Sequence, residues 1–522
     1  MSKKQIIVSI VRIFDLAVIT GITLTGIIFA CVRAEPVATA LTARAVVVAP
    51  MTSIPTNQGT VWYVDTAHGS DTNNGLTKAT PFKTITSIAN HGGRNSSRLK
   101  SGDVIVVRAG IYKETVRMQV PGHIGGSTSA GTPFAGAYTT LMAYPGDARP
   151  KIIGSGTLPD GTNILGSCPG CPAISIWAPY VRVSGFDVSL PYPVIDEQGK
   201  HYGSGIGASS LKDNTGKIIT AVHHVIIDNN IVHGSGCNGI SAGGRADYII
   251  VQGNVTYDNG FWAPDQCSGI SVGYSTDYDD DPSVYHTEVI YNISHDNQNQ
   301  VAADYIVNGQ HRTCTQPNGT PCHTDGNGII VDSDSLTTGA DHPTAYKSKT
   351  LIFGNLSYEN GGRGISVFDS NNVDVVNNTT FHNGKDATVS SRSELTAGEA
   401  SDVNFFNNIA YGRGSNEEKY LTATYAATNV VWKNNLLYNG VIYFDKSTGT
   451  SQPDSTNLLK IDPRFMMSAV PPSDGLATEN PETFHLQSGS PARGAGIPLG
   501  ASMSTLDGTV IPANVPPNIG AY

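Results

Sequence analysis

Length, composition and charge narrow the classes of protein to consider. The chain has 522 residues, 57 of them glycine, and only 15% of its residues are charged, which is typical of a turn-rich β protein and argues against long surface helices and coiled coils. Its net charge of −10, with no basic stretch to neutralise phosphates, argues against nucleic acid as a partner.

The first 34 residues indicate an export signal. Cationic residues precede an apolar run from Leu16 to Val32, and small-residue cleavage patterns follow it. An uncleaved signal anchor is the alternative, because the apolar run is almost long enough to cross a bilayer. In both cases we expect the protein outside the cytoplasm, either secreted, periplasmic or at the cell surface. Residues 35–60 are expected to form a flexible tether.

Residues 61–120 differ in pattern from the rest of the chain. They predict a strand, a turn-rich loop, a short helix near residues 84–90 and two further strands. The open end of a stacked β structure would expose an unpaired sheet edge. We therefore expect this segment to form an N-terminal cap.

Short β-type runs that end in asparagine recur along residues 223–440. The intervals between these asparagines are 24, 38, 63, 23, 30 and 27 residues, as expected for a repeat that insertions lengthen. The pattern predicts an all-β fold: a single right-handed parallel β-helix over residues 121–460, in which equivalent asparagines bond from rung to rung. A monomer with a C-terminal covering segment, residues 461–522, completes this prediction; a β-sandwich with coincidental turns is the alternative. The asparagines are Asn230, Asn254, Asn292, Asn355, Asn378, Asn408 and Asn435.

A second recurring run, of the form x-Gly-Ile, lies between ladder asparagines. Because side chains alternate along a strand, its isoleucines are expected to point inward and the flanking positions outward. Three residues after each isoleucine, an outward position holds Gly243, Gly273, Asp332 and Phe368 in successive copies. The inward isoleucines are Ile240, Ile270, Ile329 and Ile365.

Six cysteines beyond the N-terminal segment fit three disulfides. Cys237 and Cys267 each precede an x-Gly-Ile run, so a β-helix places them one rung apart, at about 4.8 Å, within bonding range. Cys314–Cys322 would close a loop, and Cys168–Cys171 a tight turn. Zinc is the alternative for the C-x-x-C pair, although no second pair has zinc-site spacing. Disulfides imply an oxidising compartment.

Two segments resemble a known family. WYVDTAHGSDTNNGLTKATPFKTI with GDVIVVRAGIYKETV, and DGNGIIVD with LSYENGGRGISVFDSNNVDVVNNTTFHNG, are similar to secreted right-handed β-helix proteins that include the family 9 polysaccharide lyases, which are pectate lyases. The resemblance implies β-elimination on a uronate-containing polysaccharide. However, Ile330 takes the place of that family's lysine base. The aspartates of its calcium cluster are missing after His295-Asp296-Asn297.

The insertions indicate where a site would lie. The 38- and 63-residue periods are adjacent and are lengthened on both sides of the x-Gly-Ile run, so their loops should wall a groove over Ser271, Asp332 and Ser366. Binding residues are more common on such loops than on the scaffold. Tolerated insertions without function are the alternative.

Aspartates near this groove are candidates for glycoside hydrolysis. Asp332 faces outward, Asp325 and Asp334 flank it, and His323 is nearby. Paired carboxylates across a groove serve as general acid and as base or nucleophile. Aspartates at turns also cap backbone amides, which is the structural alternative.

Arg363 is the first residue of the x-Gly-Ile run at 363–365, which lies one rung after Asp325. Its guanidinium could bind a uronate carboxylate, or act as a base in β-elimination if its pKa were lowered. An ion pair between Asp325 and Arg363 across adjacent rungs is the alternative.

The loop after Gly273 carries further candidates. Its aspartates could bind Ca²⁺ through oxygen ligands, or simply form an acidic surface loop. Aromatic residues on the same face could stack on sugars. The calcium candidates are Asp277, Asp279, Asp280 and Asp281, and the aromatic ones are Trp262, Tyr274, Tyr285 and Phe368.

Together these patterns predict a secreted carbohydrate-active protein whose partner is a polysaccharide, with acidic chains among the candidates. A lyase is the first prediction because of the resemblance and the acidic loop. A glycoside hydrolase that uses paired aspartates is the alternative, and a non-catalytic glycan-binding or surface protein is the third. No organic cofactor is expected.

Overall fold

The computed structural model is a right-handed parallel β-helix built from three long sheets, as the asparagine repeat predicted. Among the described residues, no helix has the length and apolar character needed to cross a membrane. The predicted signal or anchor segment and the Cys168–Cys171 pair lie outside the described residues. The structure describes residues 39–55, 59–90, 93–119, 138–154, 172–190, 203–212, 218–261, 263–264, 266–307, 310–316, 318–335, 344–389, 392–414, 420–445, 453–466 and 482–522.

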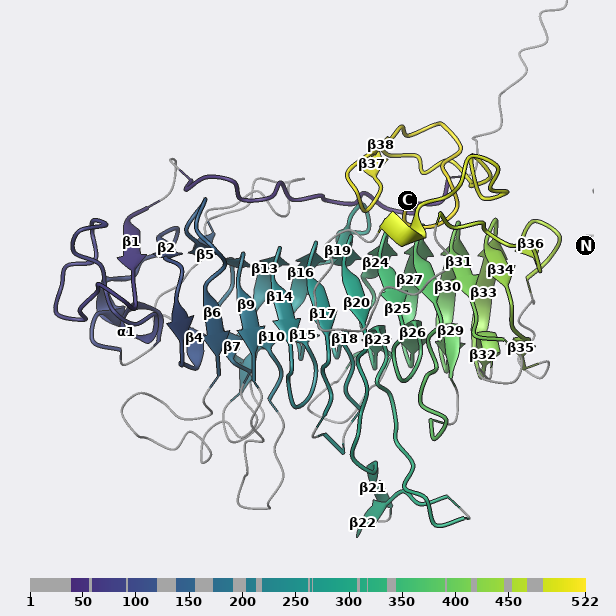
Figure 1. The fold of residues 1–522 in the computed structure, drawn as a ribbon, viewed down its shortest axis with the longest axis horizontal. Coiled ribbons are helices and arrows are strands. Elements are labelled where there is room, and N and C mark those ends of the chain that lie inside the picture. The colour runs from purple at the N-terminus through teal and green to yellow at the C-terminus, as the bar shows by residue number, and fades with distance from the viewer. Residues whose placement is uncertain are drawn as a thin grey trace, which may run out of the picture. The chain divides into compact units, whose positions relative to one another are not determined.

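Each turn of the chain adds one strand to each sheet, and Figure 1 shows the strands side by side in rows. The first sheet contains β1 Val61–Val64, β2 Val104–Val107, β5 Thr139–Ala143, β8 Val181–Ser184, β13 His223–Asp228, β16 Asp247–Gln252, β19 Tyr285–Ile290, β24 Lys349–Phe353, β27 Asn371–Val376, β30 Ser401–Phe406 and β33 Thr428–Lys433. The second contains β4 Val116–Met118, β7 Ile174–Ile176, β10 Ile206–Ala208, β15 Ile240–Gly243, β18 Ile270–Gly273, β23 Ile329–Asp332, β26 Ile365–Phe368, β29 Ser393–Gly398, β32 Tyr420–Tyr425 and β35 Ile442–Phe444. The third contains β3 Ile111–Tyr112, β6 Lys151–Ile153, β9 Asp187–Ser189, β14 Ile231–His233, β17 Val255–Tyr257, β20 Ile293–His295, β25 Leu356–Tyr358, β28 Thr379–Phe381, β31 Ile409–Tyr411, β34 Leu436–Tyr438 and β36 Leu458–Leu459.

The core is a stack of inward side chains in strict register. In the second sheet, Ile240 pairs with Ile270, which pairs with Ile329 and then Ile365 through successive strands. All four isoleucines are fully buried. The period-two assignment of inward positions in the x-Gly-Ile run is therefore confirmed, and it fixes which side chains of this sheet face outward.

The predicted asparagine ladder is present at the corner between the first and third sheets. Each side-chain amide donates to the amide oxygen of the next asparagine, for example Asn292 to Asn355 at 3.0 Å and Asn355 to Asn378 at 2.9 Å. The ladder is longer than the sequence indicated, because Asn435 donates to Asn457 at 2.9 Å. These buried amides satisfy backbone groups at each corner and so fix the bend in every rung.

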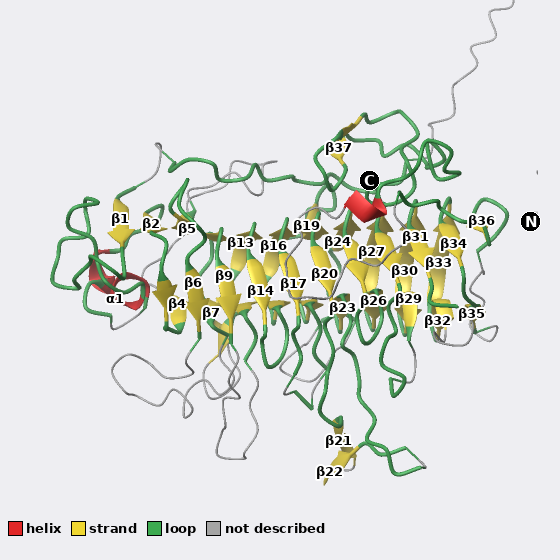
Figure 2. Ribbon diagram, in the orientation of Figure 1, coloured by secondary structure: helices red, strands yellow, loops and turns green. Residues whose placement is uncertain are grey.

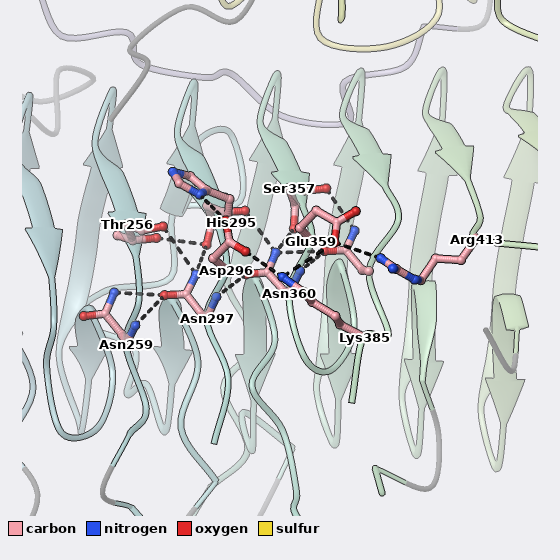
Figure 3. Close-up of polar contacts among 12 residues, drawn as sticks. Thr256, Asn259, His295, Asp296, Asn297, Ser357, Glu359, Asn360, Lys385 and Arg413 are labelled. Atoms are coloured by element: carbon pink, nitrogen blue, oxygen red, sulfur yellow. Dashed lines mark hydrogen bonds and ion pairs between the residues drawn. The ribbon is translucent and has the colours of Figure 1, made fainter. Parts of the chain in front are cut away.

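A second asparagine ladder, which the sequence analysis did not predict, follows the third sheet (Figure 3). Asn259 donates to Asn297 at 2.9 Å, and Asn297 to Asn360 at 2.9 Å. Asn360 then donates to Asn383 at 2.8 Å, and Asn383 ends the ladder on the buried carboxylate of Glu394 at 2.6 Å. The signal was in the sequence, in the recurring runs TYDNG, SHDNQ, SYENG and TFHNG.

The N-terminal segment contains the first rungs of the solenoid together with a cover for its end. Strand β1 pairs with β2 and so belongs to the first sheet. The covering role falls to the short helix α1, Thr86–Ala89, and the 3-10 turn η1, Ser96–Arg98. All four residues of α1 are buried, so the helix protects the apolar end that an open solenoid would expose.

Residues 39–55 do not form the expected flexible tether but lie along the outer face of the first sheet (Figure 1). The Thr42 amide donates to the Tyr285 hydroxyl at 2.9 Å, and the Val46 amide donates to the carboxylate of Glu288 at 2.8 Å. Burial raises the pKa of Glu288 well above its ordinary value. Sequence composition missed this docking because the partners lie more than two hundred residues away.

The C-terminal residues pack over the third sheet, and Figure 2 shows that they are mostly loop. Phe465, Phe484 and Tyr522 join one apolar cluster with Leu356 and Phe381 of the sheet. The remaining described elements are short: η5 Glu482–Phe484, and the hairpins β11 Leu211–Lys212 with β12 Ile218–Thr220, β21 Asp304–Val307 with β22 Gln310–Thr313, and β37 Met503–Ser504 with β38 Val510–Ile511.

Two of the predicted disulfides are confirmed. Cys237 and Cys267 are bonded across adjacent rungs, with Cα atoms 5.1 Å apart. Cys314 and Cys322 are bonded at the base of the β21–β22 hairpin, with Cα atoms 5.3 Å apart. The first bond joins two neighbouring rungs, and the second closes a loop within the insertion that precedes β23.

Candidate functional site

A cavity of about 450 Å³ lies on the outer face of the second sheet, and we call it the trough. Its lining is made mainly of small residues of β10, β15 and β18, with Tyr274 and Asp332 at its edge. Tyr274 is 45% exposed, so its ring is available at the rim. The small lining residues include Gly207, Ala208, Ser241, Gly243, Ser271 and Gly273.

Two glycines leave the backbone of the trough bare. Gly243 and Gly273 have φ angles of 150° and 148°, which favour glycine. A β-carbon on Gly243 would lie 1.8 Å from the Gly273 carbonyl oxygen, and one on Gly273 would lie 1.8 Å from that of Asp332. Only glycine fits at these two positions without moving the strands. The trough is therefore open along these two rungs and ends at Asp332, which holds the same outward position in the next rung.

Asp332 ends the trough with a half-buried carboxyl group. Burial, with a smaller contribution from Asp325, raises the pKa of Asp332 to about 6. The Ser333 hydroxyl donates to its Oδ1 at 2.8 Å. A carboxyl group that still holds a proton in part of the molecules near pH 6, beside an open cavity, is suited to general acid catalysis.

Asp325 and Arg363 form the ion pair that was the alternative to a catalytic role for Arg363. The Arg363 guanidinium lies 3.5 Å from Asp325 Oδ1, and both side chains are largely buried. Burial raises the pKa of Asp325 above its ordinary value, although the nearby guanidinium opposes the rise. A guanidinium that is engaged with a carboxyl group is poorly placed to act as a free base.

Asp334 is a structural residue and is removed from the catalytic candidates. Its side chain is buried, and its Oδ1 accepts a hydrogen bond from the Ser275 amide at 2.8 Å. Its carbonyl oxygen accepts the Tyr346 amide at 2.8 Å. Burial raises the pKa of Asp334 to about 7. Proximity in sequence placed it with Asp332, but the strand end turns it away from the trough.

His323 is held by a partner that the sequence did not reveal. Its Nδ1 donates to Asp386 Oδ2 at 2.5 Å, and its backbone amide donates to Thr388 at 3.0 Å. Burial tends to raise the pKa of Asp386, but the hydrogen bond from His323 holds it below its ordinary value. The contact joins two insertions that are far apart in sequence, which only the stacking of rungs brings together.

The four aspartates of the loop after Gly273 do not converge as a calcium site would require. Asp277 accepts the Ser348 amide at 3.0 Å, and Asp279 accepts the Tyr248 hydroxyl at 2.7 Å. Asp281 caps the Ser283 amide at 2.9 Å. Among the residues that the structure describes, no three histidine, cysteine or carboxylate side chains gather as metal ligands. The acidic-loop alternative describes these side chains better, since three of them anchor the loop.

The side chains of the His295-Asp296-Asn297 turn are also engaged, as Figure 3 shows. Asp296 contacts His295 Nδ1 at 2.9 Å and Lys385 Nζ at 2.7 Å. Burial tends to raise the pKa of Asp296, but these two hydrogen bonds hold it below its ordinary value. Glu359, one rung further, pairs with Arg413 at 2.9 Å. These charged side chains therefore form ion pairs that join different rungs.

The four aromatic residues that were predicted to stack on sugars do not all lie at the trough. Tyr274 lines the trough, and Phe368 is half-buried in the rung after Asp332. Tyr285 is a correction: it is fully buried, and its hydroxyl donates to Asp374 at 2.6 Å beneath residues 39–55, away from the trough. Trp262 lies outside the described residues.

The open part of the groove is shorter than predicted. Ser271 lines the trough. Ser366 and Ile330 also point outward from the sheet, but both are buried. One further carboxyl group was missed by the sequence analysis. Asp369 is half-buried, follows Phe368 in the next rung, and adds to the rise in the pKa of Asp332.

Similarity to known proteins was found among solved structures, at low sequence identity. No family model matches the chain, and no curated protein sequence matches it. Similar solved structures include the pectate lyase Pel9A, at 14% identity over 89% of this chain and 96% of that chain, with a TM-score of 0.41. A rhamnogalacturonan lyase has 15% identity over 72% and 87%, with a TM-score of 0.39, and a XylC complex with xylose has 13% over 78% and 87%, with a TM-score of 0.40. Likeness at this level leaves the reaction to be argued from the site.

Proposed function

We propose that this chain is an exported polysaccharide-cleaving enzyme that hydrolyses a glycosidic bond, with Asp332 as its general acid. The observation that supports this most is the position of Asp332, a half-buried carboxyl group with a pKa raised to about 6 by burial, at the end of an open trough. A polar trough with few large side chains suits a carbohydrate better than an apolar ligand. The two disulfides fit an oxidising compartment.

Hydrolysis needs a second carboxyl group, and Asp369 is our candidate. It follows Phe368, so it lies one rung from Asp332 and is itself half-buried. In this scheme Asp332 gives its proton to the glycosidic oxygen as the carbon–oxygen bond breaks. Asp369 takes a proton from the water whose oxygen bonds to the anomeric carbon.

A β-elimination is the second candidate, and the His323–Asp386 contact favours it. An imidazole oriented by a carboxylate at 2.5 Å is a common form of general base. In this scheme His323 removes the proton next to a uronate carboxylate, and a double bond forms as the carbon–oxygen bond on the neighbouring carbon breaks. The electron pair of that bond leaves with the oxygen, which then takes a proton from water. Arg363 would then contribute positive charge near the uronate and would not act as the base.

One assay separates the two reactions. The chain from residue 39 onward is incubated with polygalacturonate, alginate and xylan, and reducing ends and the ultraviolet absorbance of unsaturated products are followed together. Hydrolysis raises reducing ends alone, whereas elimination raises both signals. We expect reducing ends alone.

Matched variants test the residue assignments. Asp332→Asn should lower the rate by about 10²-fold or more, because it removes the transferable proton while keeping the shape of the side chain. Asp280→Asn, on the loop after Gly273, is the control and should retain full activity. If the wild-type protein made unsaturated products and His323→Ala made none, the assignment would change to β-elimination. A wild-type protein that cleaves none of the three polysaccharides would contradict the hydrolase proposal.

A further inference from the structure

The outward column that contains Asp332 continues toward both ends of the second sheet. Asp332 pairs with Gly273 on one side and with Phe368 on the other. Beyond Phe368, Gly398 is aligned with Tyr425, and at the opposite end Trp177 follows the aligned strand β7. We call this set the Asp332 column. In order it reads Trp177, Ser209, Gly243, Gly273, Asp332, Phe368, Gly398 and Tyr425.

Tyr425 lies over the glycine that precedes it in the column. A β-carbon built on Gly398 would come within 2.4 Å of Tyr425 Cζ and 2.5 Å of its hydroxyl oxygen. The Tyr425 ring therefore leans across Gly398 toward Phe368, and both aromatic side chains are half-buried. Ser366 and Thr396 also point outward here but are fully buried. This end of the sheet is thus an aromatic platform, whereas the trough is bare.

The opposite end of the column also carries an aromatic side chain. Trp177 is half-buried, and the guanidinium of Arg117 lies 4.8 Å from the centre of its ring. Seven rung spacings separate Trp177 from Tyr425, which is about 34 Å at about 4.8 Å per rung. The two aromatic ends therefore lie on either side of Asp332, separated by a length that an oligosaccharide can span.

We propose that Trp177 and the Phe368–Tyr425 platform bind the two arms of one polysaccharide chain that lies across Asp332, so that the substrate is a polymer cut at internal bonds. This inference rests on the proposed function. Sugar rings present apolar C–H faces that pack on aromatic faces, and aromatic rings dominate the energetics of such contacts. The column supplies such faces on both sides of the carboxyl group. Glycines on both rungs before Asp332 leave that arm of the path open.

The test measures retention of polysaccharide in the Asp332→Asn background, where binding is separated from cleavage. Polygalacturonate, alginate and xylan are each cast in a native gel, and the slowing of the protein is measured. Tyr425→Ala and Trp177→Ala should each weaken retention about tenfold. Gly398→Ala should weaken it similarly, because the added β-carbon displaces the Tyr425 ring while tyrosine is kept. Tyr63→Ala, on strand β1 of the first sheet, is the control and should bind normally.

Kinetics and products complete the test in the active protein. We expect Tyr425→Ala and Gly398→Ala to raise KM with little change in kcat, and wild type to release products of many lengths early in the reaction. Normal retention in Tyr425→Ala or in Trp177→Ala, or release of a single short product from the start, would overturn the inference while leaving hydrolysis intact. Failure of the wild-type chain to bind or cleave any of the three probes would instead overturn the proposed function, and this inference with it.

Discussion

The guanidinium of Arg363 lies 3.5 Å from the carboxyl group of Asp325, and both groups act electrostatically on Asp332. Asp325 contributes to the rise in the pKa of Asp332, and Arg363 opposes it. Burial is the largest cause of that raised pKa, and the pair adjusts it without itself lining the trough. This gives Arg363 a role that can be separated from that of a catalytic base.

Activity should depend on pH through Asp332. Burial raises the pKa of Asp332 to about 6, and a general acid must be protonated, so the rate should fall as pH rises through about 6. In Arg363→Met the opposing charge is gone, and the falling limb should move to higher pH by about one unit. Rate profiles of kcat/KM against pH check this. An arginine base would predict loss of activity at every pH.

Stability should depend on pH through Asp334. Burial raises its pKa in the folded state to about 7, above its ordinary value of 3.8, so its contribution to stability is present at low pH and is lost as pH rises through about 7. Asp334→Asn can still accept the Ser275 amide. The variant should be more stable than wild type at pH 8, by at most about 4 kcal/mol, and similar at pH 4. Denaturant unfolding at both pH values measures this, and an unchanged difference between them would contradict it.

The first asparagine ladder should be most sensitive in its middle. Asn355 donates to Asn378 and to the Val289 carbonyl, and it accepts from Asn292. Asn355→Ala should cost about 3 kcal/mol of unfolding free energy, because buried partners lose their hydrogen bonds. Asn457→Ala, at the end of the ladder, is the control and should cost less. Equal losses at the two sites would show that the ladder does not act as a connected set.

Asp277 should stabilise a loop whether or not calcium is present. Its carboxylate accepts the backbone amides of Lys347 and Ser348 at 3.2 and 3.0 Å, which joins neighbouring insertions. Asp277→Ala should lower the unfolding free energy by about 1 kcal/mol, with the same loss in calcium and in chelator. Thermal unfolding under both conditions checks this. A calcium-dependent rise in the Tm of wild type that the variant lacks would restore the metal-site hypothesis.

The fold was predictable because its signals are local and repeated. The recurring Asn230-to-Asn435 series and the x-Gly-Ile runs each report a rung, and period-two alternation decides which side chains point inward. The disulfide between Cys237 and Cys267 followed directly from that register. The second ladder left the same kind of signal, in the runs TYDNG, SHDNQ, SYENG and TFHNG, but a recurring turn does not by itself show which side chains bond to one another.

The candidate site was only partly predictable, since it depends on which insertions meet in space. The sequence alone determined the rungs, the inward face and the outward position of Asp332, because these follow from backbone periodicity. The tertiary structure decided that Asp334 and Tyr285 are buried, that His323 meets Asp386, and that Arg363 is engaged by Asp325. Those contacts join residues from different rungs or from opposite faces of a strand, where burial and packing, and not spacing in the chain, determine the partners.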